Sequence, residues 1–157
     1  MIADSRIKAL RGESAHIDPI LISEGLELKS VGLLVSNSPH TIWEIIYHMN
    51  YWQDFIINIL EGGNPKSPEH SEETWPSQKK PPGKQEWLEM VLRFKEGMKR
   101  AEDECRNDLS EHLQGNVGNT RFHMLMDLIM HNSYHSAQVV FIRRQLGEWP
   151  PPSGGDS

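Results

Sequence analysis

The chain has 157 residues, 37% of them hydrophobic, and a formal net charge of -6, which suits a single domain over residues 1–157 with one core. Its acidic balance argues against binding to nucleic acid or to an anionic membrane, because both partners select a basic surface. It has one cysteine, Cys105, and lacks a signal-peptide pattern or about 18 consecutive apolar residues, so we expect a cytoplasmic protein without internal disulfides.

The first helical pattern covers residues 3–11 and resumes near Pro19, a residue that suits an early helical position. A second helix is predicted after the sequence SNSPH, where Thr41 and Glu44 have the spacing of a capping box. The glycines and the proline of EGGNP, residues 61–65, should end this helix.

Residues 62–84, GGNPKSPEHSEETWPSQKKPPGK, predict a long irregular loop. Loops of this length are often functional. Trp75 lies within it, and we expect its indole to fold back onto the helices because an exposed indole is unfavourable.

A third helix is predicted over residues 84–107, where apolar side chains recur on an alternating spacing of four and three. They form one narrow inward-facing seam of Trp87, Val91, Phe94, Met98, Ala101 and Cys105. Cys105 is therefore interpreted as a small core residue and not as a nucleophile.

The fourth helix should begin with Asn119 or Thr120 as its cap and end at Gly147. The sequence EWPPPSGGDS after it cannot continue a helix and predicts a flexible tail over residues 148–157. No alternating strand pattern competes with the helices, so the predicted fold is all-α, a four-helix bundle.

Three histidines occupy the apolar stripes of two predicted helices. At 100° per residue, His131 and His135 share the inner stripe of the fourth helix, and His48 lies among the apolar residues of the second. A lone buried histidine more often bonds a carbonyl or a carboxylate, but three on interior stripes favour a shared partner. A divalent metal ion would satisfy all three, and imidazole suits both zinc and nickel.

Several neighbours could serve such a site. Glu44, one turn before His48, is a candidate catalytic or orienting group, although it is equally the second half of the capping box. Gln138, three residues after His135, could orient that imidazole. Gln138 is also a candidate for the lining of a substrate pocket, together with Tyr51, Trp52 and Tyr134. We expect the other five histidines to be solvated.

The motifs HTIWEIIYHMNYWQ (residues 40–53) and HNSYHSAQVVFIRRQLGEWPP (residues 131–151) resemble those of the DinB-like superfamily, which includes the YfiT-like metalloenzymes. The similarity spans most of the chain, from LRGESAHIDP near the start to the closing RRQLGEWPPP. It implies a four-helix bundle, typically homodimeric, in which His48, His131 and His135 bind a divalent ion, often nickel or zinc.

The activity implied by this resemblance is less specific. The leading hypothesis is a thiol-dependent S-transferase, in which a low-molecular-weight thiol activated by the metal attacks a small electrophile. A hydrolase that activates water at the metal is the nearest alternative. A noncatalytic metal-binding or small-molecule-binding bundle is the alternative from a different class.

A second apolar side of the fourth helix supports a homodimer. Phe122, Leu125, Ile129 and Val140 lie roughly opposite the histidine stripe, with small Ser133, Ser136 and Ala137 beside them. Ile42, Ile46 and Ile57 widen the apolar surface of the second helix in the same way. Deep burial within one monomer would explain the pattern equally well, and the resemblance favours the dimer.

Overall fold

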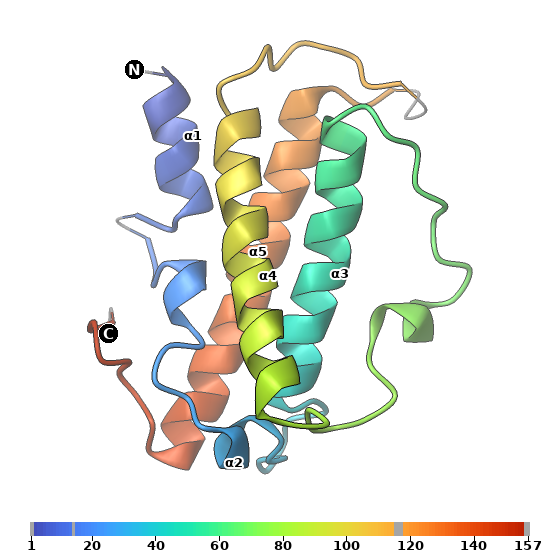
Figure 1. Ribbon diagram of the computed structural model, residues 1–157. Coiled ribbons are helices and arrows are strands. Elements are labelled where there is room, and N and C mark those ends of the chain that lie inside the picture. Colours follow the sequence, from blue (N-terminus) through green and yellow to red (C-terminus); the bar gives the residue numbers. More distant parts are fainter. Residues whose placement is uncertain (1, 14, 115–117, 156–157) are drawn as a thin grey trace.

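The computed structural model describes residues 2–13, 15–114 and 118–155. In these residues three long helices, α3 (Ile42–Leu60), α4 (Lys84–Glu104) and α5 (Arg121–Leu146), lie side by side (Figure 1). Shorter elements complete the fold: α1 (Ile2–Leu10), the 3-10 turn η1 (Pro19–Leu21), α2 (Leu28–Val31) and the 3-10 turn η2 (Ser71–Thr74). The described residues form no strand, which confirms the all-α prediction.

The order of contacts along the chain gives the directions of the helices. The residue numbers of ion-pair partners on α3 and α4 increase together, from Asp54 with Arg93 to Glu61 with Arg100. These two helices are therefore parallel. On α3 and α5 the partners run in opposite order, because His48 meets His131 and Leu60 meets Arg121. Helix α1 is likewise antiparallel to α4 (Figure 1).

The parallel arrangement of α3 and α4 explains the long loop predicted between them. Nineteen residues of α3 make a rod of roughly 28 Å at 1.5 Å per residue. The connection must return this distance before α4 can start at the same end, and Figure 1 shows it passing outside α3 with η2 on the way.

The helix ends follow the predicted signals. The capping box of Thr41 and Glu44 is present at the start of α3, and Thr120 caps α5. Gly147 ends α5 with a φ of 72°, a left-handed conformation that favours glycine. The fourth-helix boundaries are thus close to those predicted, whereas α4 ends at Glu104, three residues before the predicted end at 107.

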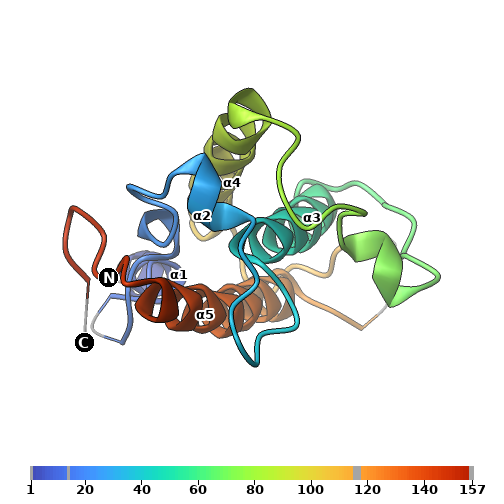
Figure 2. The same ribbon diagram turned by 90° about the horizontal axis from the view of Figure 1, so that it is seen from below.

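The core lies between α3, α4 and α5, as the view along the helices shows (Figure 2). The predicted seam of α4 is buried, apart from Val91, which is half-buried. Part of the apolar surface predicted for a dimer is buried within the monomer instead. Four of the residues predicted for it are at most 3% exposed, because α3 and α5 pack against neighbouring elements there: Ile42, Ile46, Ile57 and Leu125.

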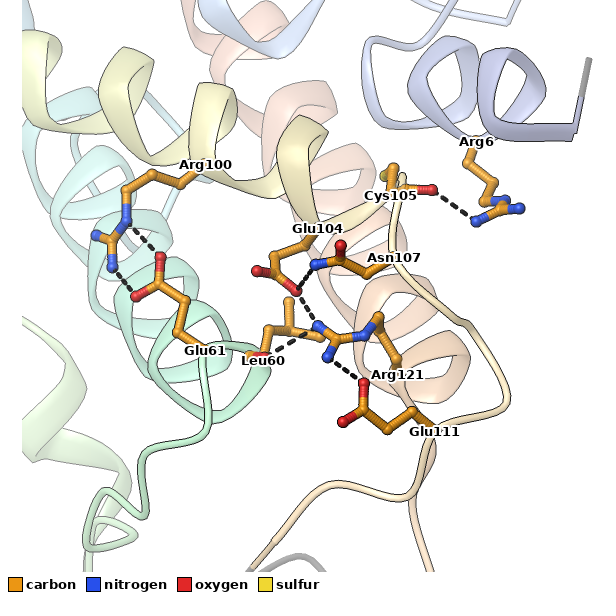
Figure 3. Close-up of polar contacts among 9 residues, drawn as sticks. All are labelled: Arg6, Leu60, Glu61, Arg100, Glu104, Cys105, Asn107, Glu111 and Arg121. Carbon is orange, nitrogen blue, oxygen red and sulfur yellow. Dashed lines mark hydrogen bonds and ion pairs between the residues drawn. The ribbon is translucent and has the colours of Figure 1, made fainter.

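Arg121 joins three segments at the end of the bundle where α3 ends and α5 begins (Figure 3). This residue is 5% exposed, and its guanidinium donates to the Leu60 carbonyl at 2.9 Å and to carboxylate oxygens of Glu104 and Glu111. It therefore fixes the end of α3, the end of α4 and the start of α5 to one another, and holds the connection that contains Glu111.

The C-terminal segment packs on the rest of the chain and does not extend freely from it. Arg143 donates to the carbonyls of Ile22, Glu24 and Glu148, and Glu24 in turn accepts from the backbone and hydroxyl of Ser153. These contacts hold Glu148 and Ser153 of the predicted flexible tail against the rest of the chain, because the Arg143 guanidinium binds the Glu148 carbonyl and Glu24 accepts from the Ser153 N–H. Residues 156–157 of that prediction lie outside the described residues.

Among the described residues, none of the helices combines the length and the apolar character that a bilayer crossing requires.

Candidate metal centre

The imidazoles of His48, His131 and His135 converge between α3 and α5. Nε2 of His131 lies 3.3 Å from Nε2 of His48, and one ring nitrogen of each histidine lies within 4.8 Å of the others. His131 and His135 are one turn apart on α5, so both rings project from the same side of that helix. His48 and His135 are 8% and 6% exposed, and the helical periodicity that placed them inside is correct.

The loop between α3 and α4 fixes the His48 ring from behind. Nδ1 of His48 lies 3.2 Å from the carbonyl oxygen of Thr74 and 3.0 Å from its hydroxyl. The hydroxyl donates its own proton to the carbonyl of Ser71, so both Thr74 oxygens accept from His48. The proton of the neutral ring is therefore on Nδ1, and Nε2 presents a lone pair.

Gln138 does the same for His135. Its Oε1 accepts from Nδ1 of His135 at 2.7 Å, which leaves Nε2 of that ring with a lone pair as well. His131 differs, because its Nδ1 is buried without a hydrogen-bond partner among the described residues. A hydrogen-bond partner thus sets the tautomer of His48 and of His135. For His135 the sequence predicted this partner, Gln138, from its spacing.

Burial keeps all three rings neutral. Burial, together with the smaller effect of the neighbouring His135, lowers the pKa of His48 to about 4 and that of His131 to about 3. Burial also lowers the pKa of His135. Neutral imidazole is the form that coordinates metal, so protons do not compete for these nitrogens near pH 7.

The spacing of the nitrogens fits a small divalent cation. Bonds of about 2.0–2.1 Å in a tetrahedral arrangement separate two ligand nitrogens by roughly 3.3–3.4 Å. The His48 and His131 nitrogens already have this separation. The donor set of three neutral imidazoles is that of catalytic zinc sites, in which a fourth position stays open.

Trp75 covers the outer side of His48. Its indole lies between two imidazoles, with ring centroids 3.9 Å from His48 and 3.8 Å from His40, and both pairs are nearly parallel. The expectation that Trp75 folds back onto the helices is confirmed. The expectation that His40 is solvated is wrong, because this ring is half-buried and stacked on the indole.

Glu44 acts as the second half of the capping box at the start of α3. One carboxylate oxygen accepts from the Thr41 backbone N–H at 2.8 Å, and the other lies 3.7 Å from Nδ1 of His40. The carboxylate thus caps α3 and points toward its N-terminal end, away from the following turn that carries His48. The geometry supports the capping role and lends no support to a catalytic role for Glu44.

The four residues predicted to line a pocket are divided by the structure. Tyr134 and Gln138 border a cavity of about 480 Å³ that also includes His40, Ile45 and Phe141. Every residue that lines it lacks a carboxylate. None of the three converging histidines lines it, and Gln138, the hydrogen-bond partner of His135, connects it to the metal centre.

Tyr51 and Trp52 lie elsewhere. They are half-buried along α3, where Trp52 packs edge-on against Tyr51 and Phe55, and neither borders this cavity. Their positions three and four residues after His48 suggested the site, but these positions lie one turn further along the helix.

Sequence reasoning missed His40 and Thr74. Neither has a periodic context, because His40 precedes α3 in an irregular segment and Thr74 ends the short 3-10 turn η2 within the long loop. The sequence signal for Thr74 was the neighbouring Trp75. Its indole is expected to pack on the helices, and this packing also places Thr74 against His48.

Comparison with known proteins gives one match. The model of the DinB family matches residues 35–155, which include all three converging histidines. No curated protein and no solved structure matches the chain.

Proposed function

The chain belongs to the DinB family, and we propose that it binds one divalent cation, nickel or zinc, through His48, His131 and His135. The observation that carries this proposal is the convergence of three ring nitrogens within 4.8 Å. Two of the rings have their Nδ1 protons engaged by Thr74 and Gln138, so their lone pairs face the shared space.

We propose that the bound ion serves a thiol-dependent S-transferase that acts on small electrophiles. When bound, a cation with an open coordination position supplies positive charge that lowers the pKa of a thiol toward neutrality. The sulfur of the thiolate would then form a bond to the electrophilic carbon, and a halide would leave or an epoxide oxygen would take up a proton.

The thiol must come from a low-molecular-weight co-substrate. Cys105 is fully buried directly after the end of α4, and burial raises the pKa of its thiol to about 11. A thiol with that pKa is almost entirely protonated at neutral pH and is a weak nucleophile.

The apolar cavity bordered by Gln138, the partner of His135, supports a small uncharged electrophile as the other substrate. Ile45, Tyr134 and Phe141 provide its apolar walls. No carboxylate lines the cavity, and Glu44 is engaged by the N-terminal end of α3, so His40 is the lining side chain that could serve as a general base for water. The apolar walls and the lack of a carboxylate base favour the transferase over the hydrolase.

Assays with the metal-loaded protein test the proposal. A chlorinated or epoxide electrophile should yield the thiol conjugate only when both the metal and a low-molecular-weight thiol are present. Turnover without thiol would instead establish the hydrolase. An ion that raises the melting temperature without any turnover would establish a noncatalytic bundle. His123→Ala, at an exposed histidine of α5, is the matched control for His131→Ala.

We further propose that two copies of the chain pair through the N-terminal half of α5. Phe122 and Met130 are 46% and 57% exposed there, and half-buried Met126 lies between them on the same side of the helix. A self-complementary apolar stripe of this kind suits a twofold interface.

Light scattering tests the dimer. The double variant Phe122→Asp with Met130→Asp should be monomeric. Leu88→Asp with Leu92→Asp, at two equally exposed positions on α4, should keep the mass of the wild type. A wild-type chain that is monomeric at micromolar concentration would refute the proposal.

A further inference from the structure

A second cavity lies on the exposed side of α5, near its C-terminal end. Its volume is about 310 Å³, and it is bordered by α5, by residues 15–17 and by Trp149. Val140, Phe141 and Trp149 make its walls largely apolar. The three converging histidines do not line it, and it adjoins the first cavity through the shared residues Ser133, Ala137 and Phe141.

Ser136 supplies an unsatisfied polar group to this cavity. The side chain is 1% exposed, and its hydroxyl has no hydrogen-bond partner among the described residues. A buried serine on a helix ordinarily donates to the carbonyl four residues earlier. A hydroxyl left unpaired beside an enclosed space is available to a bound molecule.

Arg144 supplies a cation at the opposite end. Its guanidinium carbon lies 5.2 Å from the centroid of the Trp149 ring, which holds the planar group in place by a cation–π contact. Among the described residues no carboxylate forms an ion pair with it, in contrast to its neighbour Arg143, whose guanidinium is buried and bonded to three carbonyls. An oriented, unpaired guanidinium favours carboxylate partners.

The spacing of the two polar groups limits the size of the ligand. Eight residues separate Ser136 from Arg144, about 12 Å along the helix axis. One carboxylate cannot meet both groups, so they would contact opposite ends of a single small molecule, with Val140 between them.

We propose that this cavity binds a small aryl carboxylate that carries a polar group at the end opposite its carboxylate. The carboxylate pairs with the Arg144 guanidinium, the aromatic ring packs between Phe141 and Trp149, and the distal polar group pairs with the Ser136 hydroxyl. The site is independent of the metal.

Calorimetric titration of the full chain with three probes tests the proposal: 4-hydroxycinnamate, its neutral amide, and cinnamate. The first should bind saturably below millimolar concentration and the other two at least fivefold more weakly. Arg144→Gln should weaken 4-hydroxycinnamate binding at least tenfold and leave the amide unchanged. Ser136→Ala should weaken 4-hydroxycinnamate and leave cinnamate unchanged.

Two control variants complete the experiment. Lys99→Gln, which removes the same charge from an exposed position on α4, should bind like the wild type. His131→Ala should also bind like the wild type, because the cavity does not depend on the metal. Equal binding of acid and amide, an unaffected Arg144→Gln variant, or no saturation below 10 mM would each overturn the proposal.

Discussion

The single hydrogen bond from His135 to Gln138 decides which nitrogen of that imidazole is free to coordinate. Partners of this type fix ring orientation and raise ligand basicity, and their loss typically costs 10-fold to 100-fold in metal affinity. Thr74 has the equivalent role for His48 through its carbonyl and its hydroxyl. Only the hydroxyl can be removed by substitution, so Gln138 is the cleaner position to test.

We therefore predict that Gln138→Leu weakens metal binding by about 10-fold to 100-fold without unfolding the protein. Competition titration against a chromogenic chelator measures the affinity. Gln145→Leu, at an exposed position on the same helix, should change it less than twofold. Equal affinities for the two variants would show that the hydrogen bond to His135 has no part in metal binding.

Buried neutral histidines also make the metal-free protein sensitive to acid. In the unfolded chain these rings titrate near 6.5, whereas in the fold the pKa of His48 is about 4 and that of His131 about 3. Between pH 6.5 and about 4 the unfolded chain therefore binds protons that the folded chain does not. The free energy of unfolding should fall as the pH is lowered through this window.

Urea unfolding of the metal-free protein between pH 7 and 4.5 checks this prediction. Each such histidine contributes up to about 1.4 kcal/mol per pH unit, so His131→Gln should flatten the dependence by about that slope. His112→Gln, at an exposed histidine, should keep the wild-type slope. Parallel curves for all three proteins would contradict the depressed pKa of His131.

At the scale of the elements, Arg121 and Arg100 allow a buried arginine–carboxylate contact to be compared with an exposed one (Figure 3). Both arginines bind carboxylates near the same end of the bundle. The Arg121 side chain is 7% exposed and also bonds the end of α3, whereas the Arg100 side chain is 48% exposed in a pair with Glu61. Removal of a buried partner leaves charge and carbonyl groups unsatisfied, but a surface pair contributes little.

We predict that Arg121→Met lowers the free energy of unfolding by about 3 kcal/mol. Arg100→Met should lower it by less than about 1 kcal/mol. Denaturant unfolding at pH 7 measures both. A loss of similar size in the two variants would mean that Arg121 does not hold the helix ends together.

The elements differ in how far they could be predicted. Helical periodicity placed His48, His131 and His135 inside because α3 and α5 are regular, so spacing fixes direction. The same periodicity could not decide whether Glu44 caps α3 or acts as a catalytic group. Its position three residues after Thr41 suits a cap, and its position four residues before His48 suits the site. Thr74, in the short turn η2, and His40, before α3, lie outside the long helices, where contacts are set by tertiary packing and not by local pattern.

At the scale of the whole molecule, the long connection between α3 and α4 follows from their parallel course and also contributes to the metal centre. The crossover carries Thr74 and Trp75 against His48, so the segment with the weakest helical pattern orients one of the ligands. The sequence predicted the length of this loop. It did not predict the direction of α4, because apolar spacing is the same for a parallel and an antiparallel helix.

Metal binding should stabilise the fold as a whole. Histidines from α3 and α5 share the ion, so unfolding must release it. An ion at 100 times its Kd adds about 2.7 kcal/mol to the free energy of unfolding. Thermal unfolding with nickel or zinc and with EDTA should show a higher melting temperature for the loaded wild type. An identical response from His131→Ala would place the stabilising ion elsewhere.

The metal content of the purified protein tests the central claim most directly. Elemental analysis should find about one nickel or zinc ion per wild-type chain and per His123→Ala chain. It should find almost none in His131→Ala, since two imidazoles hold such an ion far more weakly than three. Equal metal content in His131→Ala and the wild type would contradict the assignment of the three histidines as ligands.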